Sequence, residues 1–196
     1  DIAYSCSQKG LGCVPGLAPI TVSPRAVAAL EARRHPVPSF YLDLLLMRGY
    51  WEGAKYHHTA SASLLYALRE ALGIIAEEGL EDRFRRIRAN HEAFVAGIEA
   101  MGLRMLVAPA RRLPPLNTVL LPEGIADGAL RQHLLDRRGI EVLGGFGPLA
   151  GKVLRIGIMG AGSTQPNVLV LLEALTEALA EQGYRGLKLY TVYPAL

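Results

Sequence analysis

Apolar residues recur with the period of an α-helix along two long, consecutive stretches of the chain. In the first stretch, residues 62–78, the apolar positions are Leu64, Leu65, Leu68, Leu72 and Ile75. In the second, residues 80–101, they are Phe84, Ile87, Phe94, Ile98 and Met101, with His91 at the same spacing. This pattern predicts two amphipathic helices, each with one buried stripe. Thr59 and Ser61 are candidate N-caps of the first helix, and Gly79 and Gly102 are expected to end the two helices.

Shorter patterns on either side predict a mixture of strands and further helices. Apolar runs predict strands at residues 2–4, 18–22, 103–107, 117–121, 140–143 and 153–158. Helical patterns predict helices at residues 25–33, 42–48, 125–138 and 166–182. Ser23 followed by Pro24 is a typical helix start. We expect connections at 35–38 and 49–55, and a glycine-rich hairpin or loop at 144–151.

The composition fits one or two compact domains and argues against several functional classes. Of the 196 residues, 51% are hydrophobic and 20% are charged, which is enough to build a core. The net charge is only +3, and the basic residues of the run 81–86 alternate with acids, so a solvated helix face is favoured over a nucleic-acid site. No apolar run reaches membrane-span length and no secretory signal is visible, so we expect a cytoplasmic protein. Two cysteines, Cys6 and Cys13, fit a reducing compartment.

One lysine near the start of the chain is the strongest candidate for chemistry. Lys9 ends the sequence Tyr-Ser-Cys-Ser-Gln-Lys at residues 4–9, and the glycines and proline at residues 10–16 predict a turn after it. A lysine on a turn at the end of a strand is suited to forming an imine with a carbonyl cofactor, because its neutral amine is a nucleophile. Taken alone, such a lysine is more often an ordinary surface residue.

Lys9 is accompanied by four further motifs in a fixed order. The five are Ser-Cys-Ser-Gln-Lys at 5–9, Pro-Gly-Leu-Ala-Pro-Ile at 15–20, Tyr-His-His-Thr at 56–59, Leu-Tyr-Ala-Leu-Arg-Glu at 65–70 and Gly-Lys-Val-Leu-Arg-Ile-Gly at 151–157. Together they resemble the class V pyridoxal-phosphate aminotransferases, in particular the alanine–glyoxylate and serine–pyruvate branch. The resemblance runs from residue 1 to about residue 179. It implies transamination between alanine or serine and glyoxylate or pyruvate, with pyridoxal 5'-phosphate as cofactor.

The resemblance implies a role for each residue of the lysine loop. Lys9 matches the family's Schiff-base lysine, which holds the cofactor and moves a proton from the substrate α-carbon to the cofactor. Ser7 and Gln8 stand where the family contacts the cofactor, although hydrogen bonds within the loop are an equal alternative for both. Cys6 replaces the glycine that is usual in the family.

The Tyr-His-His-Thr motif implies a phosphate site shared between two subunits. Tyr56 and Thr59 match residues that reach the cofactor phosphate of the partner subunit, so the resemblance implies a homodimer. A phenol and a hydroxyl near a helix N-terminus suit a phosphate. The adjacent His57 and His58 have no third ligand close in sequence, so we expect no metal.

Arg155 matches the family arginine that holds the substrate α-carboxylate. An arginine that interrupts an apolar strand needs a partner, and its planar fork suits bidentate pairing with a carboxylate. Gly144 and Gly145 would let the backbone approach the substrate, although they are equally typical of a plain turn.

Complete enzymes of the resembled family are considerably longer, so we expect this chain to be the C-terminal half of one. The expected fold is α/β. Residues 1–79 would be the end of a fold type I large domain with a parallel, doubly wound sheet. Residues 80–196 would be a small α+β domain whose antiparallel sheet is covered by helices on one face. The acid for the pyridine nitrogen, the aromatic residue stacked on the ring and further phosphate ligands would come from upstream.

Two alternative functions remain open from the sequence. Residues 91–93, 97–103 and 146–152 resemble the ureidoglycine–glyoxylate aminotransferases of purine catabolism, whereas Gly144, Gly145 and Tyr56 favour the alanine–glyoxylate branch. A non-catalytic dimerisation or binding module is the alternative from another class. An upstream reading frame that contains the acid for the pyridine nitrogen would exclude such a module.

Overall fold

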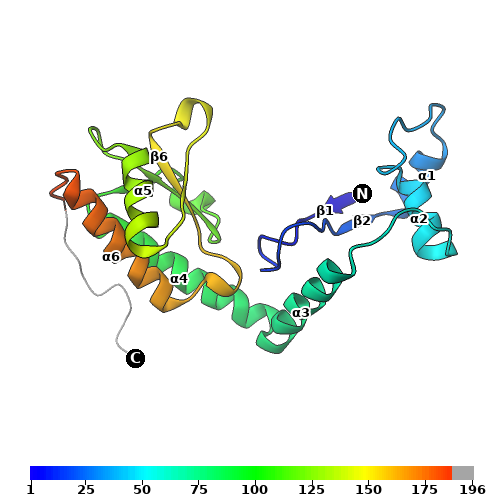
Figure 1. The fold of residues 1–196 in the computed structure, drawn as a ribbon, viewed down its shortest axis with the longest axis horizontal. Coiled ribbons are helices and arrows are strands. Elements are labelled where there is room, and N and C mark those ends of the chain that lie inside the picture. Colours follow the sequence, from blue (N-terminus) through cyan, green and yellow to red (C-terminus); the bar gives the residue numbers. More distant parts are fainter. Residues whose placement is uncertain (187–196) are drawn as a thin grey trace. The chain divides into compact units, whose positions relative to one another are not determined.

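The computed structural model describes residues 1–186 and divides the chain into two compact units (Figure 1). The first unit is Asp1–Ile74 and the second begins at Ile75, so the division falls inside one long helix. Helices and strands are mixed along the chain, which is consistent with the expected α/β class. Among the described residues, no helix combines the length and the apolar character that a membrane crossing requires.

The first unit begins with a short two-stranded sheet. Strand β1 (Ile2–Tyr4) pairs antiparallel with β2 (Ile20–Val22), with Ile2 opposite Val22. Helix α1 (Pro24–Glu31) follows directly, because the Ser23 hydroxyl accepts a hydrogen bond from the Ala26 amide and Pro24 occupies the first turn. The helix start at Ser23 is therefore confirmed. The two strands of this unit are antiparallel, so the parallel sheet of the large domain stays a prediction for the intact protein.

Helix α2 (Leu44–Gly53) is longer than the sequence pattern predicts. The predicted loop at 49–55 is wrong for residues 49–53, because the helix continues through Gly49 to Gly53. The Asp43 carboxylate caps the start by accepting hydrogen bonds from the amides of Leu45 and Leu46. The helix ends at Ala54, whose left-handed backbone (φ 55°) replaces the glycine usually found there.

Two long helices follow, α3 (Ala62–Glu78) with the predicted bounds and α4 (Leu80–Ala100), which ends one residue before the predicted end. Gly79 separates them with a positive φ of 81°, a backbone conformation that favours glycine. The predicted buried stripe of α3 is only partly correct, because Leu65 and Leu72 are about half exposed. On α4 the stripe is buried from His91 onward, whereas Phe84 is exposed.

The second unit contains a four-stranded antiparallel sheet in the order β3-β4-β6-β5. Its strands are β3 (Arg104–Met105), β4 (Leu116–Leu120), β5 (Leu143–Gly144) and β6 (Val153–Gly157). The two edge strands are much shorter than the predicted strands at 103–107 and 140–143. The amide of Ile140 instead binds the Leu134 carbonyl at the end of the preceding helix, which keeps residue 140 out of the sheet.

Three helices share one hydrophobic core with this sheet. Helix α6 (Gln165–Glu181) lies beside both α4 and α5 (Asp127–Arg138) (Figure 1). Phe94, Leu130, Leu154, Ile156 and Leu175 are among the core residues, all nearly inaccessible to solvent. Because side chains alternate along a strand, Leu154 and Ile156 face this core and Arg155 between them faces away. The expected antiparallel sheet with helices on one face is confirmed.

His91, the polar exception on the α4 stripe, has a partner in the core. Its Nδ1 lies 2.8 Å from the Asn117 Oδ1 of β4, and the Asn117 amide donates to the Pro114 carbonyl at 3.1 Å. A buried polar group is stable only when it is hydrogen-bonded in this way. His91 therefore has a structural role in this core.

Candidate functional site

Lys9 lies on an exposed turn whose backbone is fixed by hydrogen bonds. The Lys9 carbonyl accepts a hydrogen bond from the Gly12 amide at 2.9 Å, and its side chain is exposed. The loop packs onto α3 at Gly16, where an added Cβ would lie 2.7 Å from Leu64 Cδ1. These contacts fix the backbone of the turn that carries Lys9 and leave its side chain exposed to solvent.

Ser7, two residues before Lys9, holds the loop together from inside. Its hydroxyl donates to the Val14 carbonyl at 2.6 Å and accepts from the Leu17 amide at 3.4 Å, and its side chain is inaccessible to solvent. Its backbone amide donates to the Leu17 carbonyl as well. Of the two roles considered for Ser7, the structure displays the loop hydrogen bonds. Gln8 is exposed, and a cofactor contact remains a prediction for both residues.

Tyr56 and Thr59 lie together just before α3. The Tyr56 hydroxyl and the Thr59 Oγ1 are 2.7 Å apart, and both residues are exposed. Two adjacent hydroxyl groups facing solvent form a small cluster of donors that can bind an anionic oxygen. The spacing of three residues thus brings both predicted phosphate ligands to one spot.

The two histidines between them are packed among aromatic rings. The buried His57 stacks on Phe40 with ring centroids 4.3 Å apart, and its Nε2 lies 3.0 Å from the Phe40 carbonyl. His58 lies edge-on to Tyr41 and contacts His57 through the two Nδ1 atoms. Within residues 1–186, no group of three ligating side chains could hold a metal ion. The histidines instead shape the segment that carries Tyr56 and Thr59.

Arg155 lies on the open face of the second unit's sheet. It is half-buried and stands opposite Thr118 of β4 and Leu143 of β5. Its Nε donates to the Gly144 carbonyl at 2.8 Å, and its guanidinium carbon lies 4.1 Å from the centre of the Phe146 ring. Sequence reasoning found Arg155 through its motif but missed Phe146, because cross-strand contacts are not visible in a linear pattern.

Close packing surrounds Gly144 and Gly145, and at Gly145 the near atom belongs to the backbone. A side chain at Gly144 would meet the Asp127 carboxylate, with 2.5 Å between Cβ and Oδ2. A side chain at Gly145 would clash with the Leu149 carbonyl oxygen. Of the two roles considered for this pair, the structure displays the structural one, which closes the turn beside Arg155.

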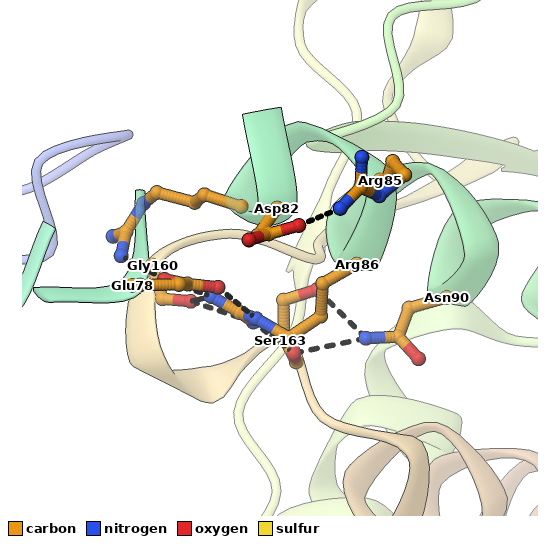
Figure 2. A network of polar contacts seen from close by, with 8 residues as sticks. Glu78, Asp82, Arg85, Arg86, Asn90, Gly160 and Ser163 are labelled. Atoms are coloured by element: carbon orange, nitrogen blue, oxygen red, sulfur yellow. Dashed lines mark hydrogen bonds and ion pairs between the residues drawn. The ribbon is translucent and has the colours of Figure 1, made fainter. Parts of the chain in front are cut away.

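A polar network that the linear pattern does not predict holds the loop after β6 in place. Figure 2 shows Glu78 with Arg86, whose guanidinium also reaches the backbone carbonyls of Gly160 and Ser163. Asn90 donates to the same Ser163 carbonyl at 2.9 Å. The run 81–86 is therefore not simply a solvated face, as the charge pattern predicted.

The carboxylate of Glu78 is the centre of this network. It also accepts a hydrogen bond from Arg83, a residue that is only 4% exposed. The hydrogen bond from Arg86, with a further contribution from Arg83, lowers the pKa of Glu78 below its usual value. Arg85, by contrast, pairs with Asp82 on the exposed side of α4. The network fixes the end of α3 to the loop at 160–163.

The predicted residues therefore fall into separate groups. The first unit holds the lysine loop and the Tyr56–Thr59 pair, and the second holds Arg155. Cys6 and Cys13, both in the lysine loop, are free thiols.

Comparison with known proteins identifies clear relatives, although no protein-family profile matches the chain. An alanine–glyoxylate aminotransferase of Callithrix jacchus is 41% identical over 184 residues, which cover 91% of this chain and 44% of the relative. The crystal structure of an alanine–glyoxylate aminotransferase from Nostoc sp. is 48% identical, with a TM-score of 0.88, over 91% of this chain and 48% of that one. A ureidoglycine–glyoxylate aminotransferase from Bacillus subtilis is 40% identical, with a TM-score of 0.92, over 98% and 50%.

The chain spans about half the length of the curated relatives that it matches. Both branches considered from the sequence, alanine–glyoxylate and ureidoglycine–glyoxylate, are represented among them.

Proposed function

Because this chain is homologous to the class V pyridoxal-phosphate aminotransferases over nine-tenths of its own length, we propose that it is the C-terminal half of such an enzyme. The intact protein would pass an amino group from alanine or serine to glyoxylate or pyruvate. The observation that carries this proposal is the similarity to alanine–glyoxylate aminotransferases across both units. Residues 1–79 would belong to the large domain and residues 80–196 to the small one.

The donor groups present suit pyridoxal 5'-phosphate. Lys9 offers an exposed primary amine for a carbonyl, and Tyr56 and Thr59 offer two hydroxyl groups 2.7 Å apart for a phosphate. When bound, the cofactor supplies an electron sink for the bond that breaks at the substrate α-carbon. The acid for its pyridine nitrogen and the residue stacked on its ring would come from the part of the enzyme outside this chain.

The residues of this chain divide the work between proton transfer and substrate binding. The Lys9 Nζ would hold the cofactor between turnovers. Once displaced by the substrate amine, it would accept the proton from the substrate α-carbon and deliver it, on the same face, to the neighbouring carbon of the cofactor. The Arg155 guanidinium would hold the substrate carboxylate and so fix which bond at the α-carbon faces the lysine.

The intact enzyme is proposed to be a homodimer in the cytoplasm. In it, Tyr56 and Thr59 of one subunit would bind the cofactor phosphate of the other. Their exposure supports this arrangement, because hydroxyl groups that serve a second subunit must lie at the surface of the first. Ser7 and Gln8 are proposed to line the cofactor edge from the lysine loop.

Ureidoglycine is the second candidate amino donor, favoured by the similarity to the enzyme from Bacillus subtilis. The deciding experiment measures kcat/KM of the full-length enzyme for alanine and for ureidoglycine, with glyoxylate as acceptor. A preference for alanine supports the alanine–glyoxylate activity. A preference for ureidoglycine places the enzyme in the other branch, and no turnover with either donor contradicts both.

A further inference from the structure

The guanidinium of Arg155 is held on two sides by groups of the second unit. On its edge, Nε donates to the Gly144 carbonyl at 2.8 Å. On its face, the Phe146 ring lies 4.1 Å from Cζ. No acidic side chain among residues 1–186 forms an ion pair with Arg155. Within residues 1–186 the charge is therefore oriented but is not neutralised.

Phe146 is presented by a tight turn and not by burial. Its ring is 74% exposed, so hydrophobic packing cannot be what fixes its position. The Leu149 amide donates to the Phe146 carbonyl at 3.0 Å, and Gly147 has a positive φ of 52°. Gly145 allows the turn to close, because any side chain there would meet the Leu149 carbonyl. The turn therefore fixes an aromatic face against the arginine.

A guanidinium in this position has one edge left for a ligand. Its planar fork can bind a carboxylate side-on, through Nε and one terminal nitrogen, or end-on, through both terminal nitrogens. The hydrogen bond to the Gly144 carbonyl occupies Nε, which excludes the side-on mode. The negative face of the aromatic ring attracts the cation and limits its rotation out of plane.

Resting on the proposed role of Arg155, we propose that Phe146 and the Gly144 carbonyl are positioning groups that make this arginine bind a substrate carboxylate end-on. One carboxylate oxygen would accept from each terminal nitrogen. Phe146 acts through Arg155 and does not itself touch the reacting atoms. The substrate class is an α-amino or α-oxo acid with an unmodified carboxylate.

The contact to the carboxylate is present before and during the reaction, so its loss changes binding more than turnover. In the full-length enzyme, Phe146→Leu keeps the apolar bulk but removes the aromatic face. We expect it to raise KM for alanine and for glyoxylate about three- to tenfold, with kcat nearly unchanged. Phe146→Tyr keeps the face and restores both KM values. Phe84→Leu, the same change at an exposed phenylalanine of α4, is the matched control.

A binding measurement and a double-mutant cycle make the test specific. Propionate, which has the carboxylate but no amine, is titrated calorimetrically into wild type, Phe146→Leu, Arg155→Lys and the double variant. We expect weaker propionate binding in each single variant and no additional loss in the double variant, because both changes act on one contact. If Phe146→Leu weakens propionate binding as much in the Arg155→Lys background as it does in wild type, the positioning role is wrong.

The two proposals fail in distinguishable ways. If Arg155→Lys leaves KM and propionate binding unchanged, the substrate-binding role of Arg155 is wrong. If Arg155→Lys weakens both but Phe146→Leu weakens neither, only the positioning role is wrong. Thermal unfolding of each variant shows whether it is folded. If Phe146→Leu lowers the unfolding temperature, the KM values of Phe146→Tyr test the role of the aromatic face instead.

Discussion

Lys9 is the residue on which the proposed chemistry depends, and its exposed turn makes that dependence testable. In the full-length enzyme, borohydride treatment with pyridoxal phosphate should attach the cofactor to the peptide that contains Lys9, because reduction fixes the bond between amine and carbonyl. Mass spectrometry of the digested protein locates the site. Lys9→Ala should abolish the attachment, and Lys55→Ala, a change at another exposed lysine, should keep it. An adduct that persists in the Lys9→Ala protein would show that another amine holds the cofactor.

The proposed contact between Arg155 and the substrate carboxylate can be tested by substitution. Arg155→Ala and Arg155→Lys should each lower kcat/KM for alanine and glyoxylate about a hundredfold in the full-length enzyme, because both remove the bidentate contact. The content of bound cofactor should stay the same, since the proposed phosphate ligands belong to a different part of the chain. Arg137→Lys, at an exposed arginine of α5, serves as the control. Wild-type kinetics in both Arg155 variants would contradict the assignment.

The candidate site residues could be found from the sequence because each sits in a short, ordered motif. What the sequence could not supply are their neighbours. Phe146 lies nine residues from Arg155, on a different segment, and the contact exists only because β5 and β6 pair. The hydrogen bond from the Ser7 hydroxyl to the Val14 carbonyl likewise depends on how the lysine loop folds back on itself. Partners that are distant in sequence are set by the fold.

At the scale of elements, the contribution of Glu78 to the stability of the α3–α4 junction can be tested. Glu78→Gln should lower the free energy of unfolding by about 2 kcal/mol, because a neutral amide replaces the carboxylate that pairs with the nearly inaccessible Arg83 and with Arg86. Urea unfolding followed by circular dichroism measures the change. Glu77→Gln makes the same substitution one residue earlier, at an exposed side chain, and should be nearly neutral.

The same junction predicts a dependence on pH. The pKa of Glu78 is lowered in the folded state, chiefly by the hydrogen bond from Arg86, from a usual value of 4.5. Its stabilising contribution is therefore complete above the unfolded pKa and is lost as the pH falls through the lower, folded pKa. The difference in stability between wild type and Glu78→Gln should shrink below about pH 4.5. A difference that grew toward acid pH would contradict this role.

Long elements were easier to predict than short ones. The bounds of α3 and α4 follow from helical periodicity sustained over many residues, with a glycine at their junction. The edge strands β3 and β5 are short because their length depends on where a neighbouring strand offers hydrogen bonds, and that is a tertiary property. Helix α2 extends beyond the end that its sequence pattern predicts, because Gly49 is tolerated inside a helix that Asp43 caps.

For the whole molecule, the distribution of buried apolar residues is uneven between the two units. The core cluster lies entirely between Phe94 and Leu179. Among the hydrophobic residues at positions 1–74, only Ala26 and Ala71 are buried, whereas Phe40, Leu42 and Trp51 are more than half exposed. Backbone opening is resisted by buried apolar contacts, so the second unit should be the more stable part.

Native-state hydrogen exchange of the 196-residue chain checks this expectation. Amides of α4, β4, β6 and α6 should exchange several-fold more slowly than those of β1 and β2, whose strands form a two-stranded sheet alone. Uniform protection along both units would mean that residues 1–74 are stabilised by contacts other than a core of their own.

The 196-residue chain by itself should bind pyridoxal phosphate weakly and should not transaminate. It spans about half the length of its relatives, and the proposed ligands of the pyridine nitrogen and ring belong to the other half. The apolar side chains left exposed at 1–74 are suited to being covered by that half, and without it they favour association. Tyr56 and Thr59, if they serve a second subunit, contribute only in a dimer.

Cofactor titration of the purified chain, followed by an alanine–glyoxylate assay, shows whether the chain alone binds the cofactor and transaminates. Absorbance and fluorescence should report only weak binding, with no turnover above that of free cofactor. The full-length enzyme under the same conditions provides the positive control, and the chain with Lys9→Ala gives the background of non-specific amine reaction. Adding the proposed N-terminal half of the enzyme as a separate polypeptide should restore binding if the two halves complete one large domain. Tight binding with turnover by the chain alone would instead show that Lys9, Tyr56, Thr59 and Arg155 suffice for the reaction.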